Sequence, residues 1–358
     1  MAFALQKQTR PAQNINSYRK SPYSTTTKTR VLLLFSIRRM TGSDSLHSHD
    51  DRPFIKDLLG VHAAAIESVR EAILRDSVGR DVYYKGGNPK RYDDIFFLRF
   101  VLSHKGKVKS ASKAALKTIK FRDDRKLNEL GDIRHRLRNL GVSNATSSGE
   151  PLPNHALYES FCGKNTGMIT QPDKDRGIII YCDVGQIDMD GIAAGMSEEK
   201  MKEYILLVNE AIFQILDDTT RRTGRLTKQM KIIDMGNVSL RKLNRAYIKR
   251  DAACSKALED YHPQILGTVF IANAPSWLSS VWTVMKRFFP KRFVEKVDIL
   301  PTLSQLKKSK DSLKPLLRYV SEEHLSERYG GKSKEWPLPS PSPCAHCDVG
   351  DSPRMLIG

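Results

Sequence analysis

The chain has 358 residues, 40% of them hydrophobic, and a formal net charge of +19; its length allows one large domain with an appendage, or two domains. No apolar run approaches the roughly 18 to 20 residues needed to cross a bilayer, which argues against an integral membrane protein. Five cysteines scattered over this length form no disulfide framework and favour a reducing compartment.

Residues 1–50 form a basic leader. Its first 43 residues hold eight basic residues and no acidic one, so the rest of the chain keeps a charge of +11. The leader is also rich in Ser and Thr, a composition typical of mitochondrial and plastid transit peptides. It is therefore predicted to be disordered or to be a targeting segment. The alternative is that Met40 is the true start of the protein.

Residues 51–145 are predicted to form an all-α cap. Apolar side chains in 54–74 recur at spacings of three and four, and helical patterns follow without strand signals. Ser110 or Ser112 is expected to cap one of these helices. The highly charged end of the segment reads as a solvated helical face, with a nucleic-acid-binding stripe as the alternative. Turn residues then separate the cap from the next segment of the chain.

Residues 151–335 alternate short β-branched runs with helical patterns. Four runs read as strands, at 177–184, 229–235, 267–274 and 295–300. Strands that alternate with helices are typical of a mainly parallel sheet with right-handed crossovers. The sequence therefore predicts an α/β domain behind the helical cap.

The helix before the fourth strand has no polar face. In NAPSWLSSVWTVMKRFFP, residues 273–290, eight large apolar side chains point in nearly every direction around a 3.6-residue turn. Burying them is worth about 12 to 24 kcal/mol, at least the whole net stability of a typical domain. This helix therefore needs protein core, an apolar ligand or a membrane as its partner.

The last residues, 336–358, are rich in Pro and Ser and are predicted to be a disordered tail. Cys344, His346 and Cys347 have the spacing of half a zinc site, but no second ligand pair is near in the sequence, and an inert tail is the alternative. Before this tail, Ser321 is expected to cap a last helix.

Signatures of catalysis are absent from the sequence. No glycine-rich dinucleotide fingerprint follows a strand, and there is no G-x-S-x-G elbow or HExxH zinc motif. Asp183, Asp188 and Asp190 follow the first strand, where α/β proteins often place active sites, but a solvated loop is the favoured interpretation. We therefore predict no enzyme, no catalytic residue and no metal; a hydrolase that uses Asp183, Asp188 or His262 is an alternative.

Five segments, taken in order, carry a family resemblance. They are DDIFFLRFVLSHKGKVKSASKAALKTIKFR, DKDRGIIIYCDVGQIDMDG, KIIDMGNVSL, YHPQILGTVFIANAPSWLSSVWTVMKRF and LSERYGG. Together they resemble the CRAL-TRIO lipid-binding and lipid-transfer family, which includes phosphatidylinositol and phosphatidylcholine transfer proteins. The resemblance runs from about Asp93 to Gly331. It implies a mainly parallel sheet that floors an apolar lipid cavity, preceded by the helical cap.

The resemblance also implies that Ser276 to Phe289 form a movable gate, which covers the cavity when closed and meets the membrane when open. The gate and cavity residues would be Trp277, Val281, Trp282, Met285, Phe288, Phe289 and Phe293. Basic residues at the end of the gate would contact an anionic membrane, or else offset the dipole of the helix end: Lys286, Arg287, Lys291 and Arg292.

For the lipid headgroup, the matching positions are His104, Lys105, Ser239, Gln264 and Lys296. The two lysines suit a phosphate as point-charge partners. Gln264 stands where phosphatidylinositol-transfer members have a glutamate, and Phe293 where they have a threonine. Ser239 matches a serine near the phosphate of phosphatidylcholine, with helix capping as the alternative.

We therefore expect a protein that binds a single lipid, by resemblance a phospholipid, and exchanges it with membranes. It is expected to need no cofactor besides that lipid, and to be a monomer without a nucleic-acid partner. The expected location is the cytoplasm with transient membrane contact, or an organelle if the leader is a transit peptide. A basic nucleic-acid-binding α/β protein is the alternative from another class.

Overall fold

The structure is a computed structural model that describes residues 50–85, 92–134, 152–162, 166–308 and 310–334. The chain divides into two compact units, and all the described residues belong to the second, Ser48–Gly358. The predicted leader up to residue 49 and the predicted tail, with Cys344, His346 and Cys347, lie outside the described residues.

The cap region begins with four helices: α1 (Ile55–Arg75), α2 (Ser77–Tyr84), α3 (Asp94–Ser103) and α4 (Val108–Asp124). Their buried side chains form one hydrophobic cluster. Aspartates cap two of them, since Asp76 accepts from the Gly79 amide and Asp93 from the Phe96 amide. The prediction that Ser110 or Ser112 caps a helix is wrong. Both lie inside α4, where the Ser112 hydroxyl donates to the carbonyl of Val108.

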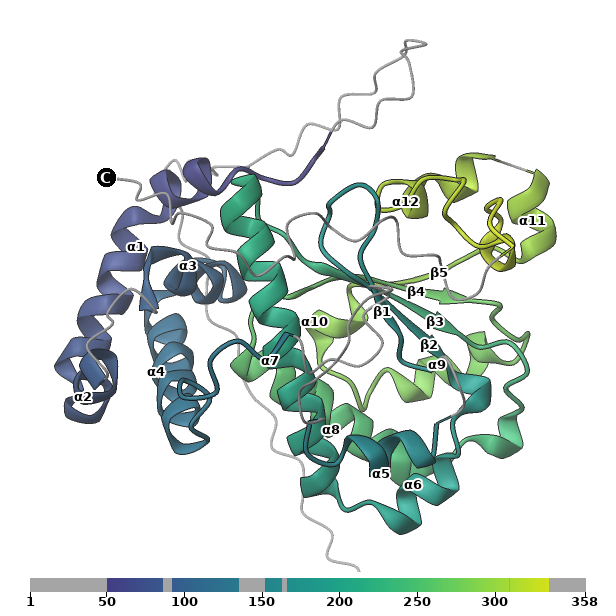
Figure 1. Cartoon of the computed structure of the whole chain (residues 1–358), viewed down its shortest axis with the longest axis horizontal. Helices are drawn as coiled ribbons and strands as arrows, with labels where there is room; N and C mark the ends of the chain where they lie inside the picture. Colours follow the sequence, from purple (N-terminus) through teal and green to yellow (C-terminus); the bar gives the residue numbers. More distant parts are fainter. Residues whose placement is uncertain (1–49, 86–91, 135–151, 163–165, 309, 335–358) are drawn as a thin grey trace, which may run out of the picture. The chain divides into compact units, whose positions relative to one another are not determined.

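The sheet has five strands in sequential order: β1 (Ile169–Thr170), β2 (Ile179–Asp183), β3 (Gln229–Asp234), β4 (Leu266–Ala272) and β5 (Val297–Ile299). The strands from β2 to β5 pair in parallel, as Figure 1 shows, which confirms the predicted parallel sheet. The antiparallel strand β1 was not predicted, because two residues give no periodic pattern.

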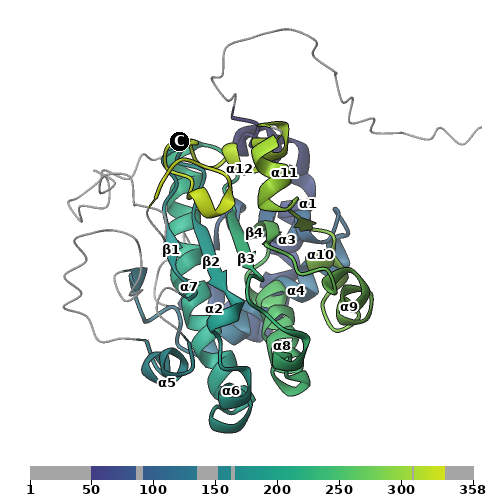
Figure 2. The ribbon, with the colours of Figure 1, turned by 90° about the vertical axis from the view of Figure 1, so that its right-hand side faces the viewer.

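Further helices accompany the sheet (Figure 2): α5 (His155–Ser160), α6 (Met189–Gly195), α7 (Glu198–Thr223), α8 (Arg245–Tyr261), α9 (Leu278–Met285), α10 (Lys291–Val294), α11 (Leu303–Lys308) and α12 (Lys314–Leu317). Short 3-10 turns lie at Val184–Gln186, Leu240–Lys242, Lys310–Leu313 and Glu327–Tyr329. Ser321 caps no helix, so that prediction is wrong: α12 ends at Leu317, and the next helical turn starts after Ser326.

Strand alternation divides the sheet into two faces. Met230 and Ile232 of β3 pack on one side, in a cluster that includes Leu306 of α11 and Leu316 of α12. The opposite side packs under α7 and α8, with Ile180 of β2 among the residues in contact. The second side is the one that α9 also approaches, because Ile271 of β4 packs with Leu278.

A buried ion pair joins the cap to the α/β region. Arg122 of α4 donates from both terminal nitrogens to Glu210 of α7, over 2.7 and 2.8 Å. The His262 ring lies 3.0 Å from the same carboxylate, just after α8. The attraction of Arg122 and the hydrogen bonds outweigh the burial of Glu210 and hold its pKa far below the usual range. This three-residue joint fixes the end of α8 against α4 and α7.

Candidate functional site

The predicted gate segment is only partly covered by protein. It forms a shorter helix than expected, α9, which ends at Met285. Leu278 is buried in it, whereas Val284 is 56% exposed and Phe288, just beyond, is 37% exposed. The other predicted gate and cavity residues are half-buried: Trp277, Val281, Trp282, Met285, Phe289 and Phe293. The segment therefore does not lie inside a filled core.

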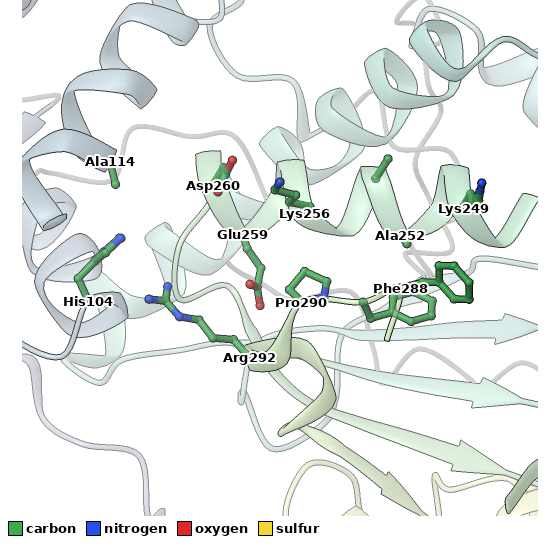
Figure 3. A pocket seen from close by; sticks show the side chains of 12 residues that line it. His104, Ala114, Lys249, Ala252, Lys256, Glu259, Asp260, Phe288, Pro290 and Arg292 are labelled. Carbon is green, nitrogen blue, oxygen red and sulfur yellow. The ribbon is translucent and has the colours of Figure 1, made fainter. Parts of the chain in front are cut away.

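A pocket of about 520 Å³ lies beside this segment, a volume in the usual range for ligand sites. Phe288, Phe289 and Pro290 form one wall and α8 forms the other, where Ala252 and Ala253 are the apolar contribution. The rest of the lining is polar or comes from the cap: His104, Ala114, Lys249, Lys256, Glu259, Asp260 and Arg292. In Figure 3, Glu259, Arg292 and His104 point into the same part of the pocket.

Three predicted headgroup residues gather near the polar end of this pocket. His104 lines the pocket itself. The side-chain amide of Gln264 donates over 3.4 Å to the hydroxyl of Ser103, which precedes His104 in the chain. Lys296 interacts electrostatically with Glu259 and Arg292, two further lining residues. Burial lowers the pKa of Lys296 and raises the pKa of Glu259, so the enclosed surroundings disfavour both charges.

The other two predicted headgroup residues, Lys105 and Ser239, do not line this pocket. Lys105 follows His104 and is exposed, and its backbone φ of 53° lies in the left-handed region. Ser239 is exposed five residues after the end of β3, whereas Gln264 and Lys296 precede β4 and β5. A six-residue strand spans about 20 Å. Ser239 is therefore at the opposite end of the sheet, and its hydroxyl makes no capping hydrogen bond.

Two further cations, Lys228 and Arg99, lie at the amino ends of the strands, near Lys296. The sequence pattern did not single them out. Lys228 precedes β3, and its pKa falls to about 8 because of burial and its cationic neighbours Lys296 and Arg99. Arg99 of α3 is 1% exposed, and its Nε and Nη1 have no hydrogen-bond partner among the described residues. Arg99 stands inside a very apolar helix and Lys228 in a loop, so periodicity alone singled out neither. The L-R-F block was the one available signal for Arg99.

The carboxyl ends of the strands are occupied by internal ion pairs. Asp234, fully buried, accepts from Arg328 over 2.6 Å and from the Tyr329 hydroxyl over 3.1 Å. Arg328 also donates to Asp183 over 3.1 Å. Asn273 completes this cluster with a 3.0 Å bond to Asp234. Asp183 therefore serves to hold the chain beyond α12 against the sheet.

The remaining candidates for a hydrolase do not converge. Asp188 caps α6 through the amide of Gly191, and Asp190 accepts from Asn244. His262 is buried against Glu210 before β4, at the other end of the strands from Asp183. No cluster of three metal-binding side chains occurs among the described residues. The carboxylates after β2 thus have structural partners and do not form a polar pocket with His262.

The basic residues at the end of the gate segment face solvent. Lys286, Arg287, Lys291 and Arg292 are all exposed, and Lys291 comes no closer than 3.9 Å to Glu295. Arg292 also lines the pocket, so it links the exposed basic group to the polar end of the cavity. Within the part of the chain that the structure describes, no helix is long and apolar enough to span a bilayer.

Comparisons with known proteins agree with this geometry. Residues 163–331 match the CRAL/TRIO domain. The Sec14 cytosolic factor of Schizosaccharomyces pombe is 23% identical over 293 residues, 81% of this chain and 90% of its own. A CRAL-TRIO domain-containing protein of Saccharomyces cerevisiae is 22% identical over 262 residues, 71% of this chain and 76% of its own. The crystal structure of Sfh5 has a TM-score of 0.48 at 14% identity, covering 71% and 83% of the two chains.

The described residues form an α/β protein with a mainly parallel sheet. Its ligand-sized pocket lies between α8 and the half-covered apolar segment. Residues 163–331 match the CRAL/TRIO domain, so this part of the chain is similar to the CRAL-TRIO lipid-binding and lipid-transfer proteins.

Proposed function

We propose that the protein binds one lipid between the sheet, α8 and α9, and exchanges it with membranes through movement of residues 276–289. The observation that carries this proposal is the exposed apolar surface of Val284 and Phe288 beside a pocket of about 520 Å³. Single exposed apolar residues are normal, but Val284 and Phe288 lie in a run of large half-buried apolar side chains, and continuous apolar surface of this kind marks interaction sites. The match to the CRAL/TRIO domain supports this interpretation.

The energetics of lipid extraction favour a covered cavity with a mobile wall. At about 0.8 kcal/mol per methylene, a 16-carbon chain exposed to water costs roughly 13 kcal/mol. The hydrocarbon must therefore be covered by apolar side chains such as those of Phe288, Phe289 and Pro290, and the site must open at the membrane surface. Val284 and Phe288 would enter the bilayer surface, while Lys286, Arg287 and Lys291 would each add about 1 kcal/mol of attraction to anionic lipids.

For the headgroup we propose an anionic group held at the amino ends of the strands by Lys228, Lys296 and Arg99, with His104 and Arg292 at the pocket. Glu259 is the acidic partner of Lys296 and Asp217 that of Arg99, 3.4 Å away, whereas Lys228 has no acidic partner among the described residues. We propose binding and transfer without catalysis. The relative named above as a cytosolic factor favours a cytoplasmic location, with the protein a monomer that touches membranes transiently.

A matched pair of valines tests the gate. Val284 of α9 and Val61 of α1 are both exposed, 56% and 78%, so Val284→Ser and Val61→Ser make the same chemical change at two places. Removing a side chain that enters the bilayer should weaken membrane engagement by about 1.5 kcal/mol, close to tenfold. We expect Val284→Ser to slow lipid transfer between vesicles by that factor, and Val61→Ser to transfer at the wild-type rate.

The lipid itself is detected by mass spectrometry of protein purified after incubation with vesicles of phosphatidylcholine, phosphatidylserine and phosphatidylinositol. One bound lipid per chain is expected. If no lipid is bound and none is transferred, the proposed function is wrong. If lipid is transferred but both valine variants behave alike, lipid binding stands and the assignment of the gate fails.

A further inference from the structure

A lysine and an aspartate face each other between the sheet and α8. Met230 and Ile232 point to the side of α11 and α12, so Lys231 of β3 points to the opposite side, toward α8. There it has Ile180 of β2 and Val269 of β4 as its register neighbours, both apolar. Lys231 therefore places an ammonium group on an otherwise apolar stretch of the sheet.

Asp251 is the nearest opposing charge. It lies four residues after Tyr247 and three before Cys254, both buried, and so belongs to the inward side of α8. The Asp251 carboxylate and the Lys231 ammonium interact electrostatically. The next residue, Ala252, lines the pocket beside the gate segment. Asp251 thus adjoins a lining residue of that pocket in the sequence, and its side chain faces the sheet.

These two charges differ from the other internal charges of the domain. Arg122 and Arg328 bond directly to Glu210 and Asp234, whereas Lys231 and Asp251 make no side-chain hydrogen bond or ion pair within the described residues. Burial lowers the pKa of Lys231 and raises the pKa of Asp251, so their mutual attraction does not offset desolvation.

Both residues are nevertheless half-buried, so part of their surface remains accessible. An enclosed charge without a hydrogen-bonding partner is costly, and a bound polar atom removes that cost. Lys231 and Asp251 are thus half-buried, partly accessible and without hydrogen-bonding partners among the described residues. Polar side chains in a ligand subsite share these properties.

The two charges select one chemistry of ligand. A phosphate or carboxylate would bond to Lys231 but be repelled by Asp251, and an ammonium group would meet the reverse. Plain hydrocarbon would leave both charges without partners. A hydroxyl group accepts from an ammonium and donates to a carboxylate at the same time. We propose that Lys231 and Asp251 form an internal polar subsite that holds a hydroxyl group on the hydrocarbon part of the bound lipid, an inference that rests on the proposed lipid binding.

The test compares two lipids that differ in this group alone. Vesicles carry equal amounts of stearoyl phosphatidylcholine and hydroxystearoyl phosphatidylcholine, the latter as a mixture of hydroxyl positions. The ratio of the two lipids captured by the protein is measured by mass spectrometry. One well-placed hydrogen bond is worth about 1 kcal/mol, so the wild-type protein should prefer the hydroxylated lipid about fivefold.

The variant Lys231→Met with Asp251→Leu replaces both charges by apolar side chains of similar size. It should lose the preference or reverse it, while capturing stearoyl phosphatidylcholine at least as well as the wild-type protein does. The control Lys113→Met, on the exposed side of α4, removes one charge elsewhere and should keep the preference. Urea denaturation checks that all three proteins fold, and the double variant should be no less stable because two unpaired charges leave the interior.

An equal capture ratio for the wild-type protein and the double variant would overturn the polar subsite, while capture itself would leave lipid binding intact. Capture of neither lipid by any of the proteins would overturn the proposed function and this inference together.

Discussion

The two ends of the parallel sheet have opposite electrostatic character. At the carboxyl ends, Asp183 and Asp234 are matched by Arg328, and every charge has a close partner. At the amino ends, Lys228 and Lys296 lie near Arg99; Asp217 pairs with Arg99 over 3.4 Å, Glu259 is the acidic neighbour of Lys296, and Lys228 has none within the described residues. Ligands of open α/β sheets usually bind at the carboxyl ends. Here the carboxyl ends carry close ion pairs, whereas Lys228 and Lys296 at the amino ends make none within the described residues.

This difference separates structural charges from charges available for a ligand. A buried ion pair with good geometry holds two chain segments together, and it loses stability when one partner is removed. An enclosed cation without a counterion lowers stability until an anion binds. Mutations at the two ends should therefore change the free energy of unfolding in opposite directions.

The largest effect is expected from Arg328→Ala at the carboxyl ends. It leaves the buried carboxylates of Asp183 and Asp234 without their cation, which should lower the free energy of unfolding by about 3 kcal/mol in urea denaturation. Arg318→Ala is the control, because the side chain of Arg318 is 63% exposed and its contact with Asp51 is 3.5 Å. That control should cost less than about 1 kcal/mol. Equal losses in both variants would contradict the role of the Arg328 pairs.

At the amino ends, Lys228→Met should do the reverse. Removing an enclosed charge that faces Lys296 and Arg99 should raise the free energy of unfolding by about 1 kcal/mol. Capture of phosphatidylinositol from vesicles should fall about tenfold, while capture of phosphatidylcholine stays the same. Lys113→Met, an exposed lysine of α4, is the control for loss of net charge. A destabilised Lys228→Met protein with unchanged capture of both lipids would remove Lys228 from the site.

The pH dependence of the same lysine gives a smaller and independent effect. Because the pKa of Lys228 is about 8 in the folded protein and higher in the unfolded chain, its charge lowers stability below pH 8. This cost disappears as the pH rises from 8 toward the unfolded value near 10.4. Between pH 7 and 9, the stability of the wild-type protein should rise relative to Lys228→Met, and its phosphatidylinositol capture should weaken. Parallel pH profiles for the two proteins would show that Lys228 does not titrate in this range.

The smallest effect is expected at Ser239, which lies at the carboxyl end of β3 and faces solvent. If the lipid phosphate is held at the amino ends, Ser239→Ala should change the free energy of unfolding by less than about 0.5 kcal/mol and leave phospholipid capture unaltered. A selective fall in phosphatidylcholine capture would instead place that headgroup at the carboxyl ends, as the family resemblance implied for this serine.

The order of the main strands and helices could be predicted from the sequence because the spacing of apolar residues reflects which side chains are buried. Runs such as 229–235 and 267–274 became β3 and β4 within a residue or two, and their parallel pairing followed from the helices between them. Periodicity says little about caps and short elements. Lys107 and not a serine precedes α4. The apolar gate segment is helical only as far as Met285; a turn follows, and then the short helix α10.

The site was only partly visible in the sequence. His104, Gln264 and Lys296 gather at one end of the structure, and nothing in a linear pattern separates Ser239 from them. Lys231 was read as one position of an apolar strand, KIIDM, and only the pairing of β3 with its neighbours shows which side it faces. Charges inside a layered fold are recognised by the partners they lack, and those partners are known only once the layers are assembled.

The joint of Arg122, Glu210 and His262 has a consequence for acidic surroundings. Since the pKa of Glu210 is held far below its unfolded value of about 4.3, the stability from this carboxylate is fully present above that value and is lost only as the pH falls further. An endosome or lysosome, at about pH 5, would therefore leave α8 clamped to α4 and α7. Acidification on that scale therefore does not open this joint.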